Sequence, residues 1–128
     1  MNKHYVLDAS ALLCLLQAEQ GADRVAEAMP DSRIGAVNFS EVVAKLVEAG
    51  LEEKAADSLI DTLQLKVIPF DEEQARLAGL LRVATRRFGL SLGDRACLAL
   101  ACVHGAVALT CEKSWMKIEG ACLVELIR

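Results

Sequence analysis

Short apolar segments typical of β-strands alternate along this chain with longer segments of helical periodicity. Strands are expected at residues 4–7, 33–37, 65–68, 106–110 and 121–126. Helices are expected at residues 9–16, 22–29, 39–49, 52–64, 72–87 and 92–104, with a short helical turn at 112–117. Strands that are separated by helices require crossover connections, which favour parallel pairing. The sequence therefore predicts a three-layer α/β fold, with a mostly parallel central sheet and helices on both faces.

The composition fits a buried parallel sheet better than a membrane protein. Hydrophobic residues make up 54% of the 128 residues, and the mean hydropathy is +0.33. The longest uninterrupted apolar runs, Ala11–Leu16 and Ala96–Val103, are far shorter than the roughly 20 residues that a membrane-spanning helix needs. The N-terminal segment lacks a secretory signal pattern, because Asp8 interrupts its apolar stretch. We expect a single soluble domain over residues 1–128 that remains in the cytoplasm and does not associate with a membrane.

The cysteines also indicate a reducing compartment. Five of them are scattered within apolar segments, at Cys14, Cys97, Cys102, Cys111 and Cys122. No two form a C-x-x-C motif or have the spacing of a zinc finger. We therefore expect reduced core thiols rather than a disulfide framework or a zinc site.

The charge of the chain gives only a weak indication of its partners. Eighteen acidic and 14 basic residues give a net charge of −4, whereas a nucleic-acid-binding domain usually has a basic surface. The basic residues are unevenly distributed, however. Four arginines fall within fourteen positions: Arg82, Arg86, Arg87 and Arg95. These side chains could form an ordinary solvated helix face or hold the backbone of an RNA.

Four acidic residues lie near the starts of predicted helices or directly after predicted strands. Asp8 follows the first strand, and Glu41 lies near the start of the helix after the second strand. Asp94 lies at the head of the most apolar helix, and Glu112 follows the strand at 106–110. In an open parallel sheet, sites form at the carboxyl ends of the strands, where the following helices begin. The four carboxylates are therefore expected to converge.

Helix capping is the alternative explanation for each acid taken alone. Asn38 with Glu41, and Ser91 with Asp94, have the spacing of an N-cap residue and its partner three residues later. Asp8 could itself be an N-cap, and helix dipoles favour acids in the first turn. Capping, however, does not predict which acids share one pocket.

Several carboxylates in one pocket repel one another, and a bound cation relieves that repulsion. Sites made of oxygen ligands suit Mg²⁺ or Mn²⁺, which retain several waters and also bind phosphates. Ser10 and Thr110 are short hydroxyl residues beside the acids, suited to support the metal ligands or to contact a phosphate oxygen. Helix-start capping is the alternative role for both hydroxyls.

The segments that contain the four acids resemble, in the same order, the four acidic motifs of the PIN domain family. They are "VLDASALL", "NFSEVVAKL", "LSLGDRACLALA" and "ALTCEKSW". The resemblance covers essentially the whole chain. The helical middle segment and the sheet-closing end are similar to those of VapC toxins of type II toxin–antitoxin pairs. The chain departs from the family pattern at Glu112, where the family usually has Asp.

This resemblance implies a Mg²⁺- or Mn²⁺-dependent endoribonuclease that is the toxin of a VapBC-type pair. Asp8 and Asp94 would be the direct metal ligands, and Glu41 would complete the acidic pocket and orient the attacking water. Glu112 would bind the metal through water or only tune the site, because its extra methylene moves the carboxylate by about one bond length. The implied partners are an RNA substrate, a VapB-like antitoxin and a second copy in a homodimer.

Two other functions stay open at this point. The chain could be a VapC-like binding module that pairs with an antitoxin but cleaves little, with Glu112 as the sign of lost activity. It could also be a phosphotransfer protein, but residues 8–10 lack the D-x-D motif of the haloacid dehalogenase type and Lys113 is badly placed for a receiver domain. For Trp115 we expect packing at the end of the chain rather than stacking on a base.

Overall fold

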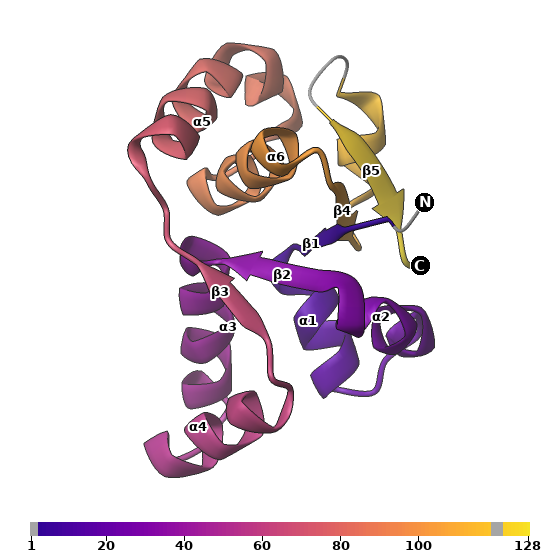
Figure 1. Cartoon of the computed structure of the whole chain (residues 1–128), viewed down its shortest axis with the longest axis vertical. Coiled ribbons are helices and arrows are strands. Elements are labelled where there is room, and N and C mark those ends of the chain that lie inside the picture. Colours follow the sequence, from indigo (N-terminus) through magenta and orange to yellow (C-terminus); the bar gives the residue numbers. More distant parts are fainter. Residues whose placement is uncertain (1–2, 119–121) are drawn as a thin grey trace.

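Five parallel strands form the central sheet of the computed structural model, which describes residues 3–118 and 122–128 (Figure 1). The strands are β1 (Tyr5–Leu7), β2 (Ser32–Gly35), β3 (Lys66–Ile68), β4 (Val107–Thr110) and β5 (Leu123–Leu126). Their order in the sheet is β3-β2-β1-β4-β5, and all four pairings are parallel. The predicted α/β fold with a parallel sheet is confirmed.

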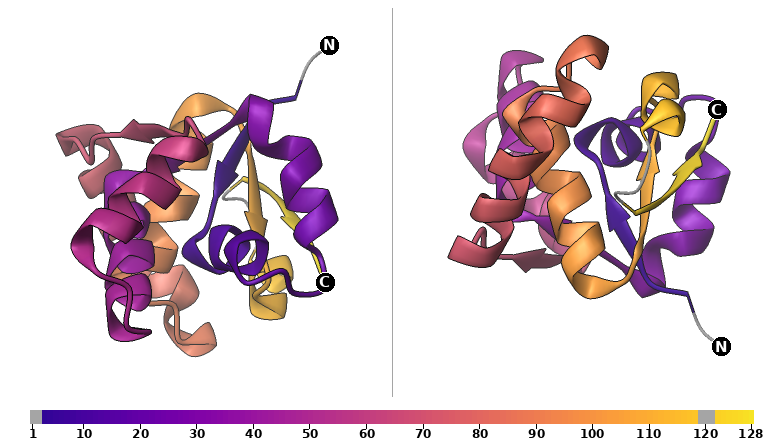
Figure 2. Two further views of the ribbon diagram at one scale, coloured as in Figure 1. Left: turned by 90° about the horizontal axis from the view of Figure 1, so that it is seen from below. Right: turned by 90° about the horizontal axis from the view of Figure 1, so that it is seen from above.

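Helices cover both faces of this sheet. They are α1 (Ala9–Leu16), α2 (Ala22–Ala28), α3 (Ala36–Glu48), α4 (Glu53–Thr62), α5 (Glu72–Thr85) and α6 (Leu92–His104). Short 3₁₀ turns add η1 (Met29–Asp31), η2 (Arg86–Phe88) and η3 (Lys113–Lys117). In Figure 1, α5 and α6 lie above the sheet, and α1, α2 and α3 lie below it. Figure 2 shows the molecule from below and from above. None of the helices in the described residues is long and apolar enough to cross a membrane.

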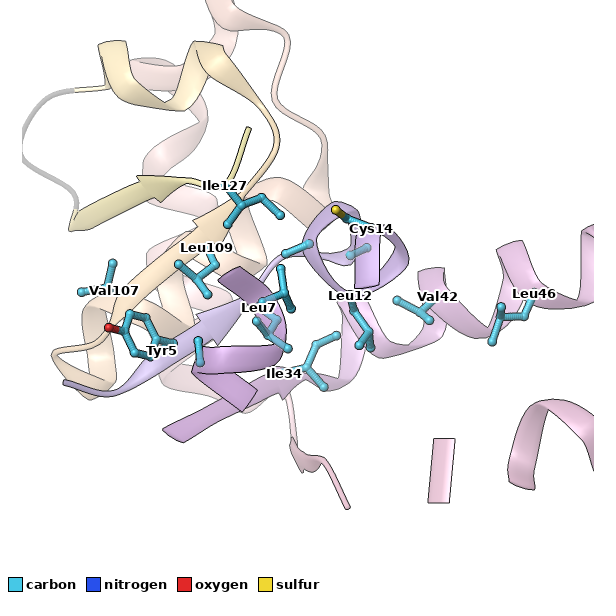
Figure 3. Close-up of a cluster of buried hydrophobic side chains, with 14 of the residues drawn as sticks. Tyr5, Leu7, Leu12, Cys14, Ile34, Val42, Leu46, Val107, Leu109 and Ile127 are labelled. Carbon is cyan, nitrogen blue, oxygen red and sulfur yellow. The ribbon is translucent and has the colours of Figure 1, made fainter. Parts of the chain in front are cut away.

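Successive side chains of a strand point to opposite faces of the sheet, so each face packs against its own layer of helices in a separate hydrophobic core. Tyr5 and Leu7 of β1 face the core formed with α1, α2 and α3, which Figure 3 shows in close-up. Val6, between them, faces the second core, where α6 and η3 pack. Trp115 of η3 belongs to this second core and is only 1% exposed. The expectation that Trp115 packs rather than stacks on a base is confirmed.

The boundary between β2 and α3 differs from the prediction. The strand ends at Gly35 and α3 begins at Ala36, although residues 33–37 were expected to form the strand and 39–49 the helix. Gly35 is the N-cap residue, with an extended backbone, and residues 36 and 37 adopt helical geometry. Asn38 therefore lies inside α3, and the predicted cap formed by Asn38 and Glu41 is wrong. The last strand is also shorter than expected, since it begins at Leu123; residue 121 of the predicted strand lies outside the described residues.

The order of the strands determines where a site can form. The chain builds β1, β2 and β3 outward in one direction and then crosses to the other side of β1 to form β4 and β5. The reversal of direction falls between β1 and β4. In open α/β sheets, ligands bind outside the carboxyl ends of the strands at such a point.

Candidate active site

Asp8 directly follows β1 at the carboxyl edge of the sheet, where the direction of the chain reverses. Its backbone N–H donates to the carbonyl of Leu109 at 2.9 Å, which continues the pairing of β1 with β4. The side chain is buried, with 3% exposure. Asp8 occupies the N-cap position of α1, yet its side chain makes no capping hydrogen bond. The capping alternative is therefore wrong for Asp8, and its carboxylate has other partners.

Two hydroxyl groups hold the Asp8 carboxylate in place. Ser10 Oγ donates to Asp8 Oδ2 at 2.7 Å, and Thr110 Oγ1 donates to the same oxygen at 2.9 Å. Each hydroxyl in turn accepts a backbone N–H: that of Cys111 reaches Ser10 Oγ, and that of Glu112 reaches Thr110 Oγ1, both at 3.0 Å. Because each hydroxyl oxygen accepts one backbone N–H, its own proton is available to donate to Asp8. The network connects the end of β1 to the end of β4, and capping does not explain either hydroxyl.

The environment of Asp8 disfavours its negative charge. Burial raises the pKa of Asp8 to about 6, against the lowering effect of the hydrogen bonds from Ser10 and Thr110, and the charge of Asp94 raises the pKa further. At neutral pH the carboxylate is still mostly ionised. A negative charge that is fixed in position and poorly solvated is suited to bind a cation.

Glu41 lies in the second turn of α3 and is half-buried. Asn38 Nδ2 donates to Glu41 Oε1 at 3.0 Å and also to the carbonyl oxygen of Gly93 at 3.0 Å. The Glu41 carboxylate packs directly on Gly93, because a Cβ atom at that position would lie 2.4 Å from Oε1. Burial raises the pKa of Glu41, the hydrogen bond from Asn38 lowers it, and the charge of Asp94 raises it.

Asp94 is the third residue of α6 and forms a capping box with Ser91. The backbone N–H of Ser91 donates to Asp94 Oδ2 at 2.9 Å, and the backbone N–H of Asp94 donates to Ser91 Oγ at 3.2 Å. The capping prediction for Ser91 and Asp94 is thus confirmed. The cap does not isolate this carboxylate, since the charge of Asp94 raises the pKa of both Asp8 and Glu41. Three acids from α3, α6 and the end of β1 therefore share one electrostatic environment.

The sequence matches the profile of a known domain family. The sequence profile of the PIN domain matches residues 5–121, which is most of the chain. The chain belongs to the PIN domain family. PIN domains form a nuclease family and are typically metal-dependent. No curated protein matches the sequence.

Solved structures share the fold of this PIN domain over nearly its full length. The DNA-bound VapBC of Salmonella typhimurium is similar, with a TM-score of 0.77 and 16% identity over 99% of this chain and 100% of that one. A toxin–antitoxin complex from Klebsiella pneumoniae has a TM-score of 0.76 and 21% identity over 97% and 98% of the two chains. VapBC-5 of Mycobacterium tuberculosis has a TM-score of 0.64 and 22% identity, with 99% of both chains covered. At these identities the likeness shows a VapC-like fold.

The oxygen donors of this PIN domain fit a small divalent cation. The described residues contain no group of three or more His, Cys, Asp or Glu side chains placed to hold a metal ion together. Mg²⁺ does not need such a group, because it commonly binds through one or two carboxylates, several waters and the phosphates of a substrate. Asp8 and Asp94 can supply two carboxylates. Among the described residues, hydrogen bonds reach one oxygen of Glu41 and one of Asp94, which leaves the second oxygen of each available.

Glu112 differs from the other three acids of the PIN domain in its exposure to solvent. It is the N-cap residue of η3, its side chain is exposed, and its backbone N–H binds Thr110. Across residues 3–118 and 122–128, the Glu112 carboxylate makes no hydrogen bond or ion pair. The charge of Asp94 therefore acts on Asp8 and on Glu41, whereas the Glu112 side chain is exposed to solvent.

The four arginines differ in what they contact. Arg82, Arg86 and Arg87 are exposed on α5 and η2, whereas Arg95 is half-buried. Arg95 Nη1 donates to the carbonyl of Ala78 at 2.8 Å, so this side chain connects α6 to α5. The exposed arginines keep their charges available to a ligand.

The raised pKa of Asp8 predicts a stability gain when the charge is removed. The Asp8 carboxyl stays protonated in the folded state up to about pH 6, whereas its ordinary pKa is 3.8. The free energy of unfolding therefore falls as the pH rises from 3.8 to about 6. The charge then costs on the order of 1–3 kcal/mol at neutral pH. In Asp8→Asn the amide oxygen can still accept both hydroxyl hydrogen bonds. Without metal, we expect this variant to melt several degrees above the wild type at pH 7.5, by about 5 °C.

Thermal unfolding in EDTA at two pH values tests this expectation. At pH 4, close to the ordinary pKa of 3.8, the carboxyl of the folded wild type is already protonated, so most of the advantage of the Asp8→Asn variant is expected to disappear. A variant that is less stable than the wild type by the same amount at both pH values would contradict a charge effect and indicate lost packing or hydrogen bonds.

Proposed function

We propose that this PIN domain, over residues 1–128, is a Mg²⁺- or Mn²⁺-dependent endoribonuclease and the toxin of a VapBC-type toxin–antitoxin pair. The observation that carries the proposal is the set of three acids Asp8, Glu41 and Asp94, of which Asp8 is held at the carboxyl edge of the sheet by Ser10 and Thr110. Asp94 acts electrostatically on both other acids, although the three come from separate elements. Carboxylates kept close together at the carboxyl edge of a parallel sheet are typical of a cation and phosphate site rather than of helix caps.

In this mechanism Asp8 and Asp94 are the residues that would hold the cation. A bound Mg²⁺ or Mn²⁺ ion supplies an activated water and neutralises negative charge on the scissile phosphate. Ser10 and Thr110 keep the Asp8 carboxylate at one orientation through their two hydrogen bonds. Glu41, whose carboxylate is half-buried, accepts a proton from the attacking water or orients it.

The charged surface near the site supports an RNA substrate. Arg82, Arg86 and Arg87 are exposed on the helical layer that also contains Asp94, and they would contact phosphates of the RNA backbone. The negative net charge of the protein does not exclude this substrate, because a bound cation adds local positive charge.

The proposed partners follow from the structural neighbours. The similar structures from Salmonella typhimurium and Klebsiella pneumoniae are toxin–antitoxin complexes. We expect a homodimer and a VapB-like antitoxin whose arginine or lysine enters the acidic pocket. A guanidinium can pair with a carboxylate in bidentate fashion, so it would compete with the cation for Asp8 or Asp94.

A VapC-like binding module that pairs with an antitoxin but cleaves little is the second candidate. The specific observation in its favour is Glu112, which replaces the usual Asp and has an exposed side chain. Both candidates predict antitoxin binding, and only the first predicts metal-dependent cleavage.

Cleavage of RNA by the purified protein separates these candidates. We expect cleavage with Mg²⁺ or Mn²⁺ and none in EDTA. The same ions are expected to raise the melting temperature by several degrees, since a ligand that binds only the folded state stabilises it by about 3 kcal/mol at 100 times its dissociation constant. KCl at matched ionic strength is the control for general screening. Undiminished cleavage in EDTA would exclude the metal mechanism, and antitoxin binding without any cleavage would favour the binding module.

A further inference from the structure

Asn38 is a buried polar residue whose position neither the fold nor helix capping explains. It is the third residue of α3 and has no exposed surface. A buried amide costs free energy unless its hydrogen-bonding groups have partners. Within residues 3–118 and 122–128, the amide oxygen, Oδ1, lacks a hydrogen-bond partner, whereas the nitrogen, Nδ2, makes two hydrogen bonds. The function of Asn38 must therefore be sought on the side of its amino group.

The two hydrogen bonds of Asn38 join two of the acids in the site. One proton of Nδ2 binds Glu41 Oε1, and the other binds the carbonyl of Gly93, which belongs to the peptide bond that leads into Asp94. The N–H of the same peptide group donates to Ser91 Oγ in the capping box. Asn38 thus connects the Glu41 side chain on α3 to the backbone that positions Asp94 on α6.

Gly93 completes the support from the other side. A Cβ atom on Gly93 would lie 2.4 Å from Glu41 Oε1 and 2.8 Å from its Cδ and Oε2, so the carboxylate rests on the glycine backbone. Glu41 and Asp94 both carry negative charge and repel each other across this contact. Without a donor beside it, the half-exposed Glu41 side chain would be free to turn toward solvent.

We propose that Asn38 is a positioning residue that holds the Glu41 carboxylate at a fixed separation from Asp94 and thereby preorganises the acidic site for a divalent cation. The inference rests on the proposed function and adds a residue outside the four acidic positions. Asn38 bonds Glu41, which completes the acidic pocket, and the peptide group that leads into Asp94, a proposed metal ligand. Residues that orient metal ligands through hydrogen bonds typically contribute 10- to 100-fold to metal affinity.

Asn38→Leu is the variant that distinguishes positioning from a structural role. Leucine has the same branching as asparagine but bulkier terminal groups, and it lacks the two donors and the unpartnered oxygen. The metal-free protein is therefore expected to fold, with a loss of stability of no more than about 1–3 kcal/mol. The affinity for Mn²⁺, measured by calorimetry, is expected to fall about 10- to 100-fold. RNA cleavage at a fixed, limiting Mn²⁺ concentration is expected to fall by a similar factor and to recover partly when Mn²⁺ is raised.

A double-mutant cycle shows whether Asn38 acts through Glu41. In a Glu41→Gln background, Asn38→Leu is expected to have little further effect on Mn²⁺ affinity, because both changes disrupt the same positioned Glu41 carboxylate. Equal and additive losses in both backgrounds would overturn the proposal. If Asn38→Leu failed to fold, Asn38→Ala would serve in the same cycle, since it removes the donors without adding bulk.

The outcomes separate this inference from the function on which it rests. Wild-type protein that binds Mn²⁺ and cleaves RNA, with Asn38→Leu unchanged in both, would overturn the positioning role alone. Wild-type protein that neither binds Mn²⁺ nor cleaves RNA would overturn the proposed function and the positioning role together. Loss of Mn²⁺ affinity in Asn38→Leu, with the fold retained and no added loss in the Glu41→Gln background, is the expected result.

Discussion

Asp8→Asn and Asp94→Asn are each expected to reduce metal-dependent RNA cleavage by at least about 100-fold, as the loss of one preorganised electrostatic group commonly does. Each substitution preserves the shape of the side chain and removes a carboxylate that would hold the cation. In Asp8→Asn the new amide can still accept the bonds from Ser10 and Thr110, so the geometry of the site is expected to survive. Initial cleavage rates at saturating Mg²⁺, measured against the wild type, give the result.

Two controls make this result specific to the two proposed metal ligands. Glu112→Gln is expected to cost much less activity, because its side chain is exposed and departs from the family pattern. The melting temperature of each variant without metal reports on folding. An Asp8 or Asp94 variant that unfolds would show that the acid is needed for structure, and one that cleaves RNA at the wild-type rate would refute its assignment as a metal ligand.

Trp115→Ala is expected to destabilise the protein by about 3–5 kcal/mol, the usual cost of removing a large aromatic side chain from a core. Trp115 is 1% exposed and packs in the core that α6 shares with the sheet. Since the free energy of unfolding of such domains is only about 5–15 kcal/mol, this loss would be a large part of the total stability. The melting temperature is expected to fall on the order of 10 °C or more.

Met116→Ala is the matched control for Trp115→Ala. Met116 follows Trp115 in η3 and is 56% exposed. Its replacement is expected to change stability by no more than about 0.5 kcal/mol. Urea unfolding of both variants measures the difference directly. A Trp115 variant within about 1 kcal/mol of the wild type, on the order of a surface substitution, would mean that the indole contributes little to this core.

The sequence was sufficient to predict the layers of the fold because the strands and helices have distinct periodicities and alternate along the chain. It was also sufficient to predict that Asp8 and Thr110 lie at one edge, since each stands at the carboxyl end of a parallel strand. The order of the strands was not predicted. That order depends on which strand pairs with β1 across about a hundred residues, and no local pattern encodes such a pairing.

The role of Asn38 could not be predicted, because the start of helix α3 is not evident from the sequence. Ala36 and Val37 are compatible with a strand, so the helix was placed three residues late and Asn38 was interpreted as its cap. With the helix beginning at Ala36, the spacing between Asn38 and Glu41 puts the two side chains on one helical face instead. The close contact between Glu41 and Gly93 depends on how α3 packs on α6, which sequence alone does not show.

The hydrogen bond between Asp8 and Thr110 spans 102 positions of the chain, and this has a consequence for biosynthesis. Synthesis proceeds from the N-terminus at about 5–20 residues per second. Residues 4–7 therefore leave the ribosome several seconds before the strand at 107–110 exists to pair with them. During that interval one edge of the innermost strand is open, and Asp8 has no Thr110 hydroxyl beside it. The nascent polypeptide acquires its complete acidic site only after Thr110 has been added, so the act of translation itself delays the appearance of any activity that depends on that site.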